Sequence, residues 1–209
     1  MGVCYIFASL ACGWTPPVGP GDLVVAADAG YLRLNGVKPD LVVGDFDSLG
    51  FVPEGEGVVR HPARKDDTDT LLAVRLGLAR GCRTFAILGG LGGRLDHTLA
   101  NIQTLAYLSA RGARGCLVGA EETALMLDGG SIRFAAGLSG AISVFAYGAP
   151  ARGVTEEGLE YPLDRATLSP DYPLGVSNAF SGSPARISVE EGRLLIVWNG
   201  RPEDTDFFL

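Results

Sequence analysis

Short apolar runs alternate with segments of helical periodicity through the first 126 residues of the chain. The apolar runs predict buried strands at residues 3–8, 23–27, 41–43, 58–60, 84–88 and 116–118. Helices are predicted at residues 30–35, 68–80 and 95–110, and each is followed by a glycine suited to the left-handed end of a helix. This alternation is typical of βα units that form a largely parallel sheet.

In the last of these helices, apolar side chains recur at helical spacing. The repeating positions are Leu95, Leu99, Ile102, Leu105 and Ala106. Residues three and four apart share one face of an α-helix, so we expect this face to be buried.

After Asp128-Gly129-Gly130 the pattern changes to short β-type runs separated by Gly and Pro residues. Strands are predicted at residues 132–134, 141–146, 185–189 and 194–198. The last two flank Glu190-Glu191-Gly192, which predicts a β-hairpin. There is no long helical pattern, so we predict a second domain that is a small all-β sandwich or barrel and begins near residue 129.

The composition argues against several classes of protein. A net charge of −7 argues against a nucleic-acid binder, which needs a basic surface, and 47% hydrophobic residues argue against disorder. The four cysteines form no Cys-x-x-Cys pair, so neither a zinc site nor a disulfide framework is indicated. No basic residue precedes Arg33, and no run approaches the ~18 apolar residues of a membrane span, so we expect a cytoplasmic protein without a signal peptide.

Two aspartates directly follow the strand predicted at residues 41–43, in the sequence Gly44-Asp45-Phe46-Asp47-Ser48. Ligands of open α/β sheets bind at this edge, where the strands end. In an extended backbone, residues i and i+2 point the same way, so Asp45 and Asp47 can converge on one hard cation. The alternative is a turn in which Asp47 and Ser48 only satisfy backbone donors.

A second acidic segment, Lys65-Asp66-Asp67-Thr68-Asp69, opens the helix predicted at residues 68–80. The helix dipole favours acidic residues there by roughly 0.3–1 kcal/mol each, so capping is a sufficient structural explanation. Three aspartates in four positions nevertheless exceed what one cap requires, and Asp66 and Asp69 share a helix face. Lys65 can contact a phosphate, although a solvated lysine is more common.

A glycine-rich segment, residues 89–97 with the sequence GGLGGRLDH, lies between a predicted strand and a predicted helix. Glycines let backbone N–H groups approach a phosphate, and a helix N-terminus favours an anion. The segment matches neither the Walker motif nor Gly-x-Gly-x-x-Gly, and a turn without any ligand is the alternative. Under nucleotide binding, the predicted contacts are Gly92, Gly93, Arg94, Asp96 and His97.

Asp28 ends the strand predicted at residues 23–27 in the same manner. Four loops therefore place six aspartates on one rim of the sheet, namely Asp28, Asp45, Asp47, Asp66, Asp69 and Asp96. Negative charges this close together repel one another. Mg²⁺ together with a polyphosphate resolves that conflict.

Taken in order and spacing, these segments resemble the thiamine pyrophosphokinase family. The resemblance spans roughly residues 24 to 198 and includes the segments that begin at Asp28, Lys38, Gly44, Lys65 and Gly89. Gly175-Val176-Ser177-Asn178 is similar to the thiamine-side motif of the family. The family usually has Asp-Gly-Gly-Ala-Asn where this chain has Asp28-Ala29-Gly30-Tyr31-Leu32.

The resemblance implies an α/β fold with a Rossmann-like, parallel-sheet domain that binds ATP at residues 1–127, followed by an all-β sandwich domain that binds thiamine at residues 131–209. It implies transfer of a pyrophosphoryl group from ATP to the hydroxyl of thiamine, with Mg²⁺ as the metal and AMP as the second product. It also implies a homodimer with its active site near the subunit interface.

The same resemblance assigns roles to residues. We predict that Asp45, Asp47 and Asp69 are metal ligands or catalytic carboxylates, that Asp28 and Asp66 lie nearby on the nucleotide side, and that thiamine is bound by Ser177 and Asn178. The alternatives are a pyrophosphokinase for another hydroxymethyl heterocycle, such as a pterin, and a non-catalytic sensor of nucleotide or thiamine. The Ser-Asn motif favours thiamine, and the many carboxylates favour an enzyme.

Overall fold

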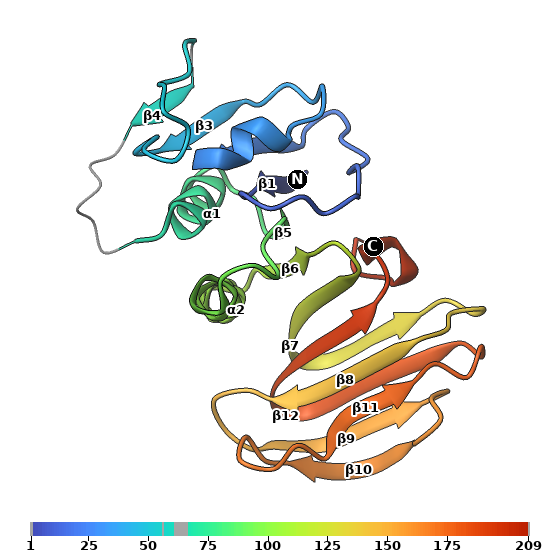
Figure 1. The fold of residues 1–209 in the computed structure, drawn as a ribbon. Helices are drawn as coiled ribbons and strands as arrows, with labels where there is room; N and C mark the ends of the chain where they lie inside the picture. The colour runs from blue at the N-terminus through green and yellow to red at the C-terminus, as the bar shows by residue number, and fades with distance from the viewer. Residues whose placement is uncertain (1, 56, 61–66, 209) are drawn as a thin grey trace. The chain divides into compact units, whose positions relative to one another are not determined.

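Residues 2–55, 57–60 and 67–208 are described by the computed structural model (Figure 1). The chain divides into two units, Met1–Ala120 and Glu121–Leu209. Two residues of the predicted acidic motif, Lys65 and Asp66, lie outside the described residues.

Parallel strands form the sheet of the first unit. Their order across the sheet is β6 (Arg114–Val118), β5 (Thr84–Leu88), β1 (Val3–Phe7), β2 (Leu23–Ala27), β3 (Leu41–Gly44) and β4 (Val58–Arg60). The central strands β1 and β5 are buried along almost their whole length, as expected for apolar runs in a parallel sheet covered on both faces. The strands predicted for this half of the chain are confirmed.

Two α-helices pack against this sheet (Figure 1). Helix α1 (Asp69–Ala79) contacts β1, β2 and β3, and α2 (Leu95–Ser109) contacts β6. Gly77 allows the close approach of α1, because a Cβ atom there would lie 2.6 Å from the ring of Phe85. A short 3-10 helix, η1 (Asp28–Arg33), occupies most of the segment for which a helix at residues 30–35 was predicted.

The buried face of α2 differs from the predicted face. Leu95 and Leu99 are 72% and 54% exposed, so the prediction was wrong for the first half of the helix. The buried positions are Asn101, Thr104, Leu105 and Leu108. Leu105 and Leu108 pack over Gly115 of β6, where an added Cβ atom would lie 2.6 Å from Leu108, and this contact fixes the rotation of the helix.

Two long antiparallel strands, β7 (Glu122–Phe134) and β12 (Ala185–Asn199), run through the second unit and pair with each other. The first half of β12 also pairs with β9 (Ala151–Glu157), and its second half pairs with β8 (Ala141–Ala146). Strand β10 (Leu163–Leu168) adds to β9, and β11 (Gly175–Ala179) adds to β8. A short 3-10 helix, η2 (Pro202–Asp204), follows β12.

The predicted hairpin at residues 190–192 is wrong, because β12 is one continuous strand. Its register with β7 shifts between Val189 and Arg193, where its second neighbour changes from β9 to β8. Gly192 lies in this stretch with a φ of 91°, and an added Cβ atom would lie 2.9 Å from the carbonyl oxygen of Pro150. A strand irregularity that requires glycine therefore takes the place of the predicted reversal.

Aromatic side chains fill part of the core of the second unit. The ring centroid of Phe134 lies 5.3 Å from that of Phe180 and 5.5 Å from that of Trp198. Trp198 is fully buried on β12, so this cluster anchors the second half of the strand. In the described part of the chain, every helix is too short or too polar to cross a membrane.

Candidate active site

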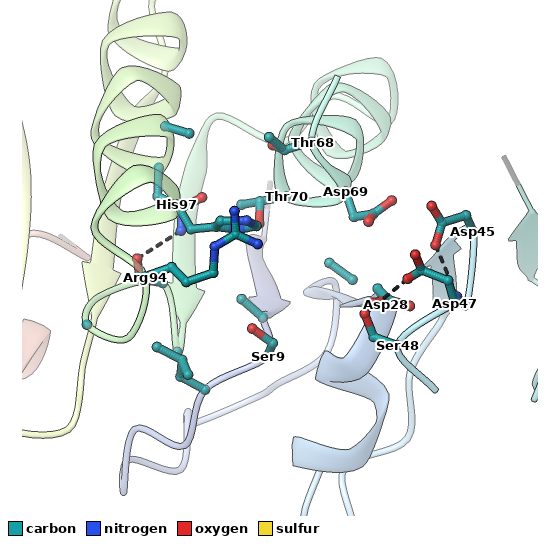
Figure 2. Close-up of a pocket in the computed structure, with 18 residues that line it drawn as sticks. Ser9, Asp28, Asp45, Asp47, Ser48, Thr68, Asp69, Thr70, Arg94 and His97 are labelled. Carbon is teal, nitrogen blue, oxygen red and sulfur yellow. Dashed lines mark hydrogen bonds between the residues drawn. The ribbon is translucent and has the colours of Figure 1, made fainter. Parts of the chain in front are cut away.

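The loops that follow four parallel strands border a cavity of about 480 Å³ (Figure 2). Ser9 comes after β1, Asp28 after β2, Asp45 after β3 and Gly89 after β5. The carboxyl ends of parallel strands meet at one edge of a sheet, which is where open α/β sheets bind their ligands. Asp69, the first residue of α1, also lines this cavity.

Three carboxylates of the cavity lie close together. Asp28, Asp45 and Asp47 each offer an oxygen, and these oxygens lie within 4.8 Å of one another. The approach of β3 to Asp28 depends on Gly44, where an added Cβ atom would lie 3.1 Å from the Cα atom of Asp28. Oδ1 of Asp28 is buried and finds no hydrogen-bond partner among the described residues. An unsatisfied buried oxygen beside two further carboxylates suits a hard divalent cation such as Mg²⁺.

The geometry between Asp45 and Asp47 is not the extended backbone that we predicted. Phe46 has a φ of 65° and its side chain is buried, so the chain turns at this residue. The Asp47 N–H donates to Oδ1 of Asp45 at 3.1 Å, and the Ser48 hydroxyl donates to Oδ1 of Asp47 at 3.1 Å. The two aspartates therefore converge through a turn anchored by Phe46, and the turn and the carboxylate cluster exist together.

In the described part of the second acidic segment, three neighbouring residues have different contacts. Asp67 forms an ion pair with Arg75 at 2.6 Å. The Thr68 hydroxyl accepts a hydrogen bond from the Leu71 N–H at 3.2 Å and caps α1. Capping is thus performed by Thr68, and both Thr68 and Asp69 line the cavity.

The glycine loop after β5 is held in place from two sides. Gly89 has a φ of 70°, and an added Cβ atom would lie 2.0 Å from the carbonyl oxygen of Leu10, so only glycine fits. The buried amide of Asn101 on α2 donates to the Gly90 carbonyl at 2.8 Å. The loop is therefore fixed before any ligand binds. Gly92 lines the cavity, whereas Gly93 is not among the lining residues.

Arg94 and His97 form the basic side of the cavity, opposite Asp28, Asp45 and Asp47 (Figure 2). Arg94 donates two hydrogen bonds to Asp96, at 3.1 Å from Nε and 2.6 Å from Nη2. These bonds lower the pKa of Asp96 below its ordinary value. Asp96 itself does not line the cavity, so its contact with the cavity runs through Arg94.

The cavity also includes residues that were not predicted from the sequence. Ser9 and Leu10 line the cavity and were not among the predicted site residues. Ser9 follows the apolar run of β1 just as Asp28 follows that of β2, and this common position was the available signal. Asn101 gave a weaker signal, as a polar residue among the apolar positions of a helix.

The predicted thiamine residues lie in the second unit. Ser177 and Asn178, on β11, line a different cavity of about 400 Å³. Ser177 has a φ of 60°, and its N–H donates to the Ser143 hydroxyl at 3.1 Å. The buried carboxyl of Glu156, on β9, lines the same cavity and was not predicted.

Two family models match this chain. The model for the catalytic domain of thiamin pyrophosphokinase matches residues 20–117, and the model for its vitamin B1 binding domain matches residues 132–194. The chain belongs to the thiamine pyrophosphokinase family. The resemblance found in the sequence is thereby confirmed.

Relatives of the same family align over most of the chain. Thiamine pyrophosphokinase 1 of Oryza sativa subsp. japonica is 26% identical over 198 residues, which cover 86% of this chain and 72% of the relative. Thiamine pyrophosphokinase of Bacillus subtilis (strain 168) is 26% identical over 184 residues, covering 84% of this chain and 86% of the relative. The crystal structure of a Bacillus subtilis thiamine pyrophosphokinase superposes with a TM-score of 0.81 at 24% identity, over 94% of this chain and 98% of that one.

The residues of the two cavities fall in different family matches. The thiamine pyrophosphokinase catalytic match contains Asp28, Asp45, Asp47, Asp69 and Arg94. The vitamin B1 binding match contains Glu156, Ser177 and Asn178. The likeness in structure shows a mixed α/β fold common to the family and this chain.

Proposed function

We propose that this chain is a thiamine diphosphokinase that transfers the pyrophosphoryl group of ATP to the hydroxyl of thiamine and releases AMP. Family membership supports the reaction. One observation carries its location: Asp28, Asp45 and Asp47 converge on one side of a cavity that has Arg94 on the other side. A polyphosphate with a bound cation needs both kinds of charge.

The acidic side of this cavity would hold Mg²⁺. Asp28, Asp45 and Asp47 would supply ligands, with Asp69 as a further ligand or a catalytic carboxylate. When bound, Mg²⁺ neutralises charge on the phosphate oxygens and orients them. The carboxylates of this chain would hold the positive charge of the metal at the ends of the parallel strands.

The opposite side of the cavity would bind the phosphates of ATP. The fixed loop of Gly89, Gly90 and Gly92 brings backbone close to the cavity, and the N-terminus of α2 favours an anion there. The guanidinium of Arg94 can pair with phosphate oxygens, and His97 lies beside it as a polar contact. These groups would hold the chain of phosphates in line for transfer.

The transfer itself exchanges one bond for another. The hydroxyl oxygen of thiamine forms a bond to the β-phosphorus, and the bond from that phosphorus to the oxygen bridging the α-phosphate breaks. AMP leaves with the electron pair of that bond, and the hydroxyl proton is released. Reactions of this type depend chiefly on position and charge neutralisation, which the fixed loops and carboxylates would provide.

The chain divides between Ala120 and Glu121, a few residues before the predicted boundary, and we assign a separate role to each part. In this proposal, residues 1–127 form a Rossmann-like domain that binds ATP, and residues 131–209 form a β-sandwich domain that binds thiamine near Ser177 and Asn178. We also propose a cytoplasmic homodimer in which the active site lies near the subunit interface, as the family resemblance implies.

The test is a product assay on the purified chain. The protein is incubated with ATP, Mg²⁺ and either thiamine or a hydroxymethylpterin, and AMP and the diphosphate are measured by mass spectrometry. We expect AMP and thiamine diphosphate in equal amounts with thiamine, and neither product with the matched Asp45→Asn variant. AMP formed only in the presence of the pterin would show that the pterin, and not thiamine, is the substrate. Binding without AMP release would indicate a sensor.

A further inference from the structure

The second cavity is built from three strands or their ends. Glu156 comes from β9, Leu163 begins β10, and Val176 and Asn178 lie on β11. Tyr161, in the segment before β10, completes the wall with an exposed aromatic ring. The cavity thus has apolar and aromatic walls around a small number of polar groups, which is the usual form of a site for a small organic molecule.

Asn178 has no hydrogen-bonding capacity left for a ligand. Its Nδ2 donates to Oε2 of Glu156 at 2.9 Å and to the Tyr161 carbonyl at 2.8 Å. Its Oδ1 accepts from the N–H groups of Tyr161, at 3.0 Å, and Ala179, at 2.9 Å. A side-chain amide offers two N–H donors and two acceptor lone pairs, and here all four are used within the chain.

Glu156 is in the opposite situation. The residue is 1% exposed, and its Oε1 finds no hydrogen-bond partner among the described residues. Two arginines of the adjoining strands are engaged elsewhere, since Arg186 pairs with Glu157 at 3.6 Å and Arg165 pairs with Glu190 at 3.0 Å. A buried carboxyl oxygen without a partner is costly, so a ligand that supplies the missing hydrogen bond gains affinity.

We propose that Glu156 is the specificity-determining residue of this cavity, that its Oε1 hydrogen-bonds an amino-substituted heterocycle, and that Asn178 positions Glu156 without contacting the ligand itself. This inference rests on the proposed function, because the aminopyrimidine ring of thiamine carries such an amine. The amine donates to Oε1, and the ring lies between apolar walls. Burial raises the pKa of Glu156 to about 7, so the carboxyl can offer either an acceptor or a proton near neutral pH.

The experiment compares thiamine with oxythiamine, in which a carbonyl oxygen replaces the exocyclic amine. The ratio of kcat/KM for thiamine to that for oxythiamine is measured at saturating ATP in the wild type, Glu156→Gln and Glu156→Asp. Gln replaces an acceptor by an amide donor, and Asp withdraws the carboxyl from the ligand. We expect the ratio to fall roughly tenfold or more in Glu156→Gln and by less in Glu156→Asp, while the KM for ATP stays constant.

The matched control is Glu157→Gln, which makes the same chemical change at the next residue, on an exposed side chain. Its ratio should equal that of the wild type. An unchanged ratio in a folded Glu156→Gln or Glu156→Asp protein, checked by circular dichroism, would overturn the assignment of Glu156 alone. If the wild type makes no thiamine diphosphate at all, the proposed function fails and this inference fails with it.

Discussion

Arg94 and Asp96 form a two-point ion pair at the start of α2, with nitrogen-to-oxygen distances of 3.1 and 2.6 Å. Arg94 lines the cavity at the ends of the parallel strands, and Asp96 does not. The aspartate therefore holds the planar guanidinium in an orientation that a lysine ammonium could not reproduce.

Arg94→Lys should accordingly weaken the binding of ATP more than the binding of thiamine. We expect the KM for ATP to rise roughly tenfold, which corresponds to about 1.4 kcal/mol, because the bidentate pairing with phosphate oxygens is lost. The KM for thiamine should change less than twofold. Steady-state kinetics with each substrate varied in turn measure both values, and equal increases would contradict the placement of Arg94 at the phosphates.

Variants of Thr68 and Asp69 distinguish effects on stability from effects on catalysis at the start of α1. Thr68→Ala removes the helix cap and should lower the free energy of unfolding by about 1 kcal/mol. Its loss of kcat should be smaller than that of Asp69→Asn, because Thr68 lines the cavity without a charge. Asp69→Asn should lower kcat by ~100-fold or more and lower the free energy of unfolding by at most about 1 kcal/mol. Urea unfolding and AMP release are measured on both proteins. A fully active Asp69→Asn enzyme would leave that residue with a structural role only.

The carboxylate cluster predicts a metal effect that can be measured without turnover. Without Mg²⁺, Asp28→Asn should be at least as stable as the wild type, because it removes repulsion from Asp45 and Asp47. Millimolar Mg²⁺ should raise the Tm of the wild type by a few degrees and leave that of the variant unchanged. Differential scanning calorimetry with and without Mg²⁺ decides, and equal shifts in both proteins would place the metal elsewhere.

A shared active site predicts complementation between inactive chains. Asp45→Asn should lack metal binding, and Asn178→Ala should be nearly inactive at low thiamine concentration, because Glu156 loses the hydrogen bond that positions it. If each site combines the first unit of one chain with the second unit of its partner, mixed dimers contain one intact site and regain activity that neither parent shows. Activity is measured after subunit exchange has been demonstrated by mass spectrometry of labelled chains. No recovery after exchange would refute a site shared between subunits.

Glu156 predicts a pH dependence of stability with a definite sign. Its pKa is raised from 4.5 to about 7 by burial, so the native state keeps this proton in a range where the unfolded chain has lost it. The stability due to this group is therefore full below pH 4.5 and falls as the pH rises toward 7.

Glu156→Gln removes that titration. The free energy of unfolding of the variant minus that of the wild type should rise by on the order of 1–3 kcal/mol from pH 5 to pH 8. Urea unfolding at the two pH values measures the difference, and the exposed Glu157→Gln variant serves as the control. A difference between variant and wild type that does not change with pH would show that Glu156 titrates normally.

The sequence was most informative where one local pattern determines the structure. The apolar runs of the first unit and the polar residues that follow them are adjacent in the chain, so the strands and the acidic edge could both be predicted. The convergence of Asp45 and Asp47 was predicted for the wrong backbone, because nothing in the local sequence showed that Phe46 would turn inward.

Other features depend on contacts between distant residues. Leu95 and Leu99 have the spacing of a buried face, but the rotation of α2 is fixed by its contact with Gly115. The pairing of Asn178 with Glu156 joins residues 22 positions apart, on strands that were not predicted. A hydrophobic pattern gives neither the rotation of a helix nor the partner of a buried polar group.

The continuous strand β12 also bears on how this unit can change in evolution. Its ladder is interrupted between Val189 and Arg193, and the two halves on either side pair with different neighbours. A residue gained or lost in that interval changes the size of the irregularity, while the alternation of inward and outward side chains on each side is preserved. Selection can therefore alter the half of β12 beside Glu156 and the half that carries Trp198 separately.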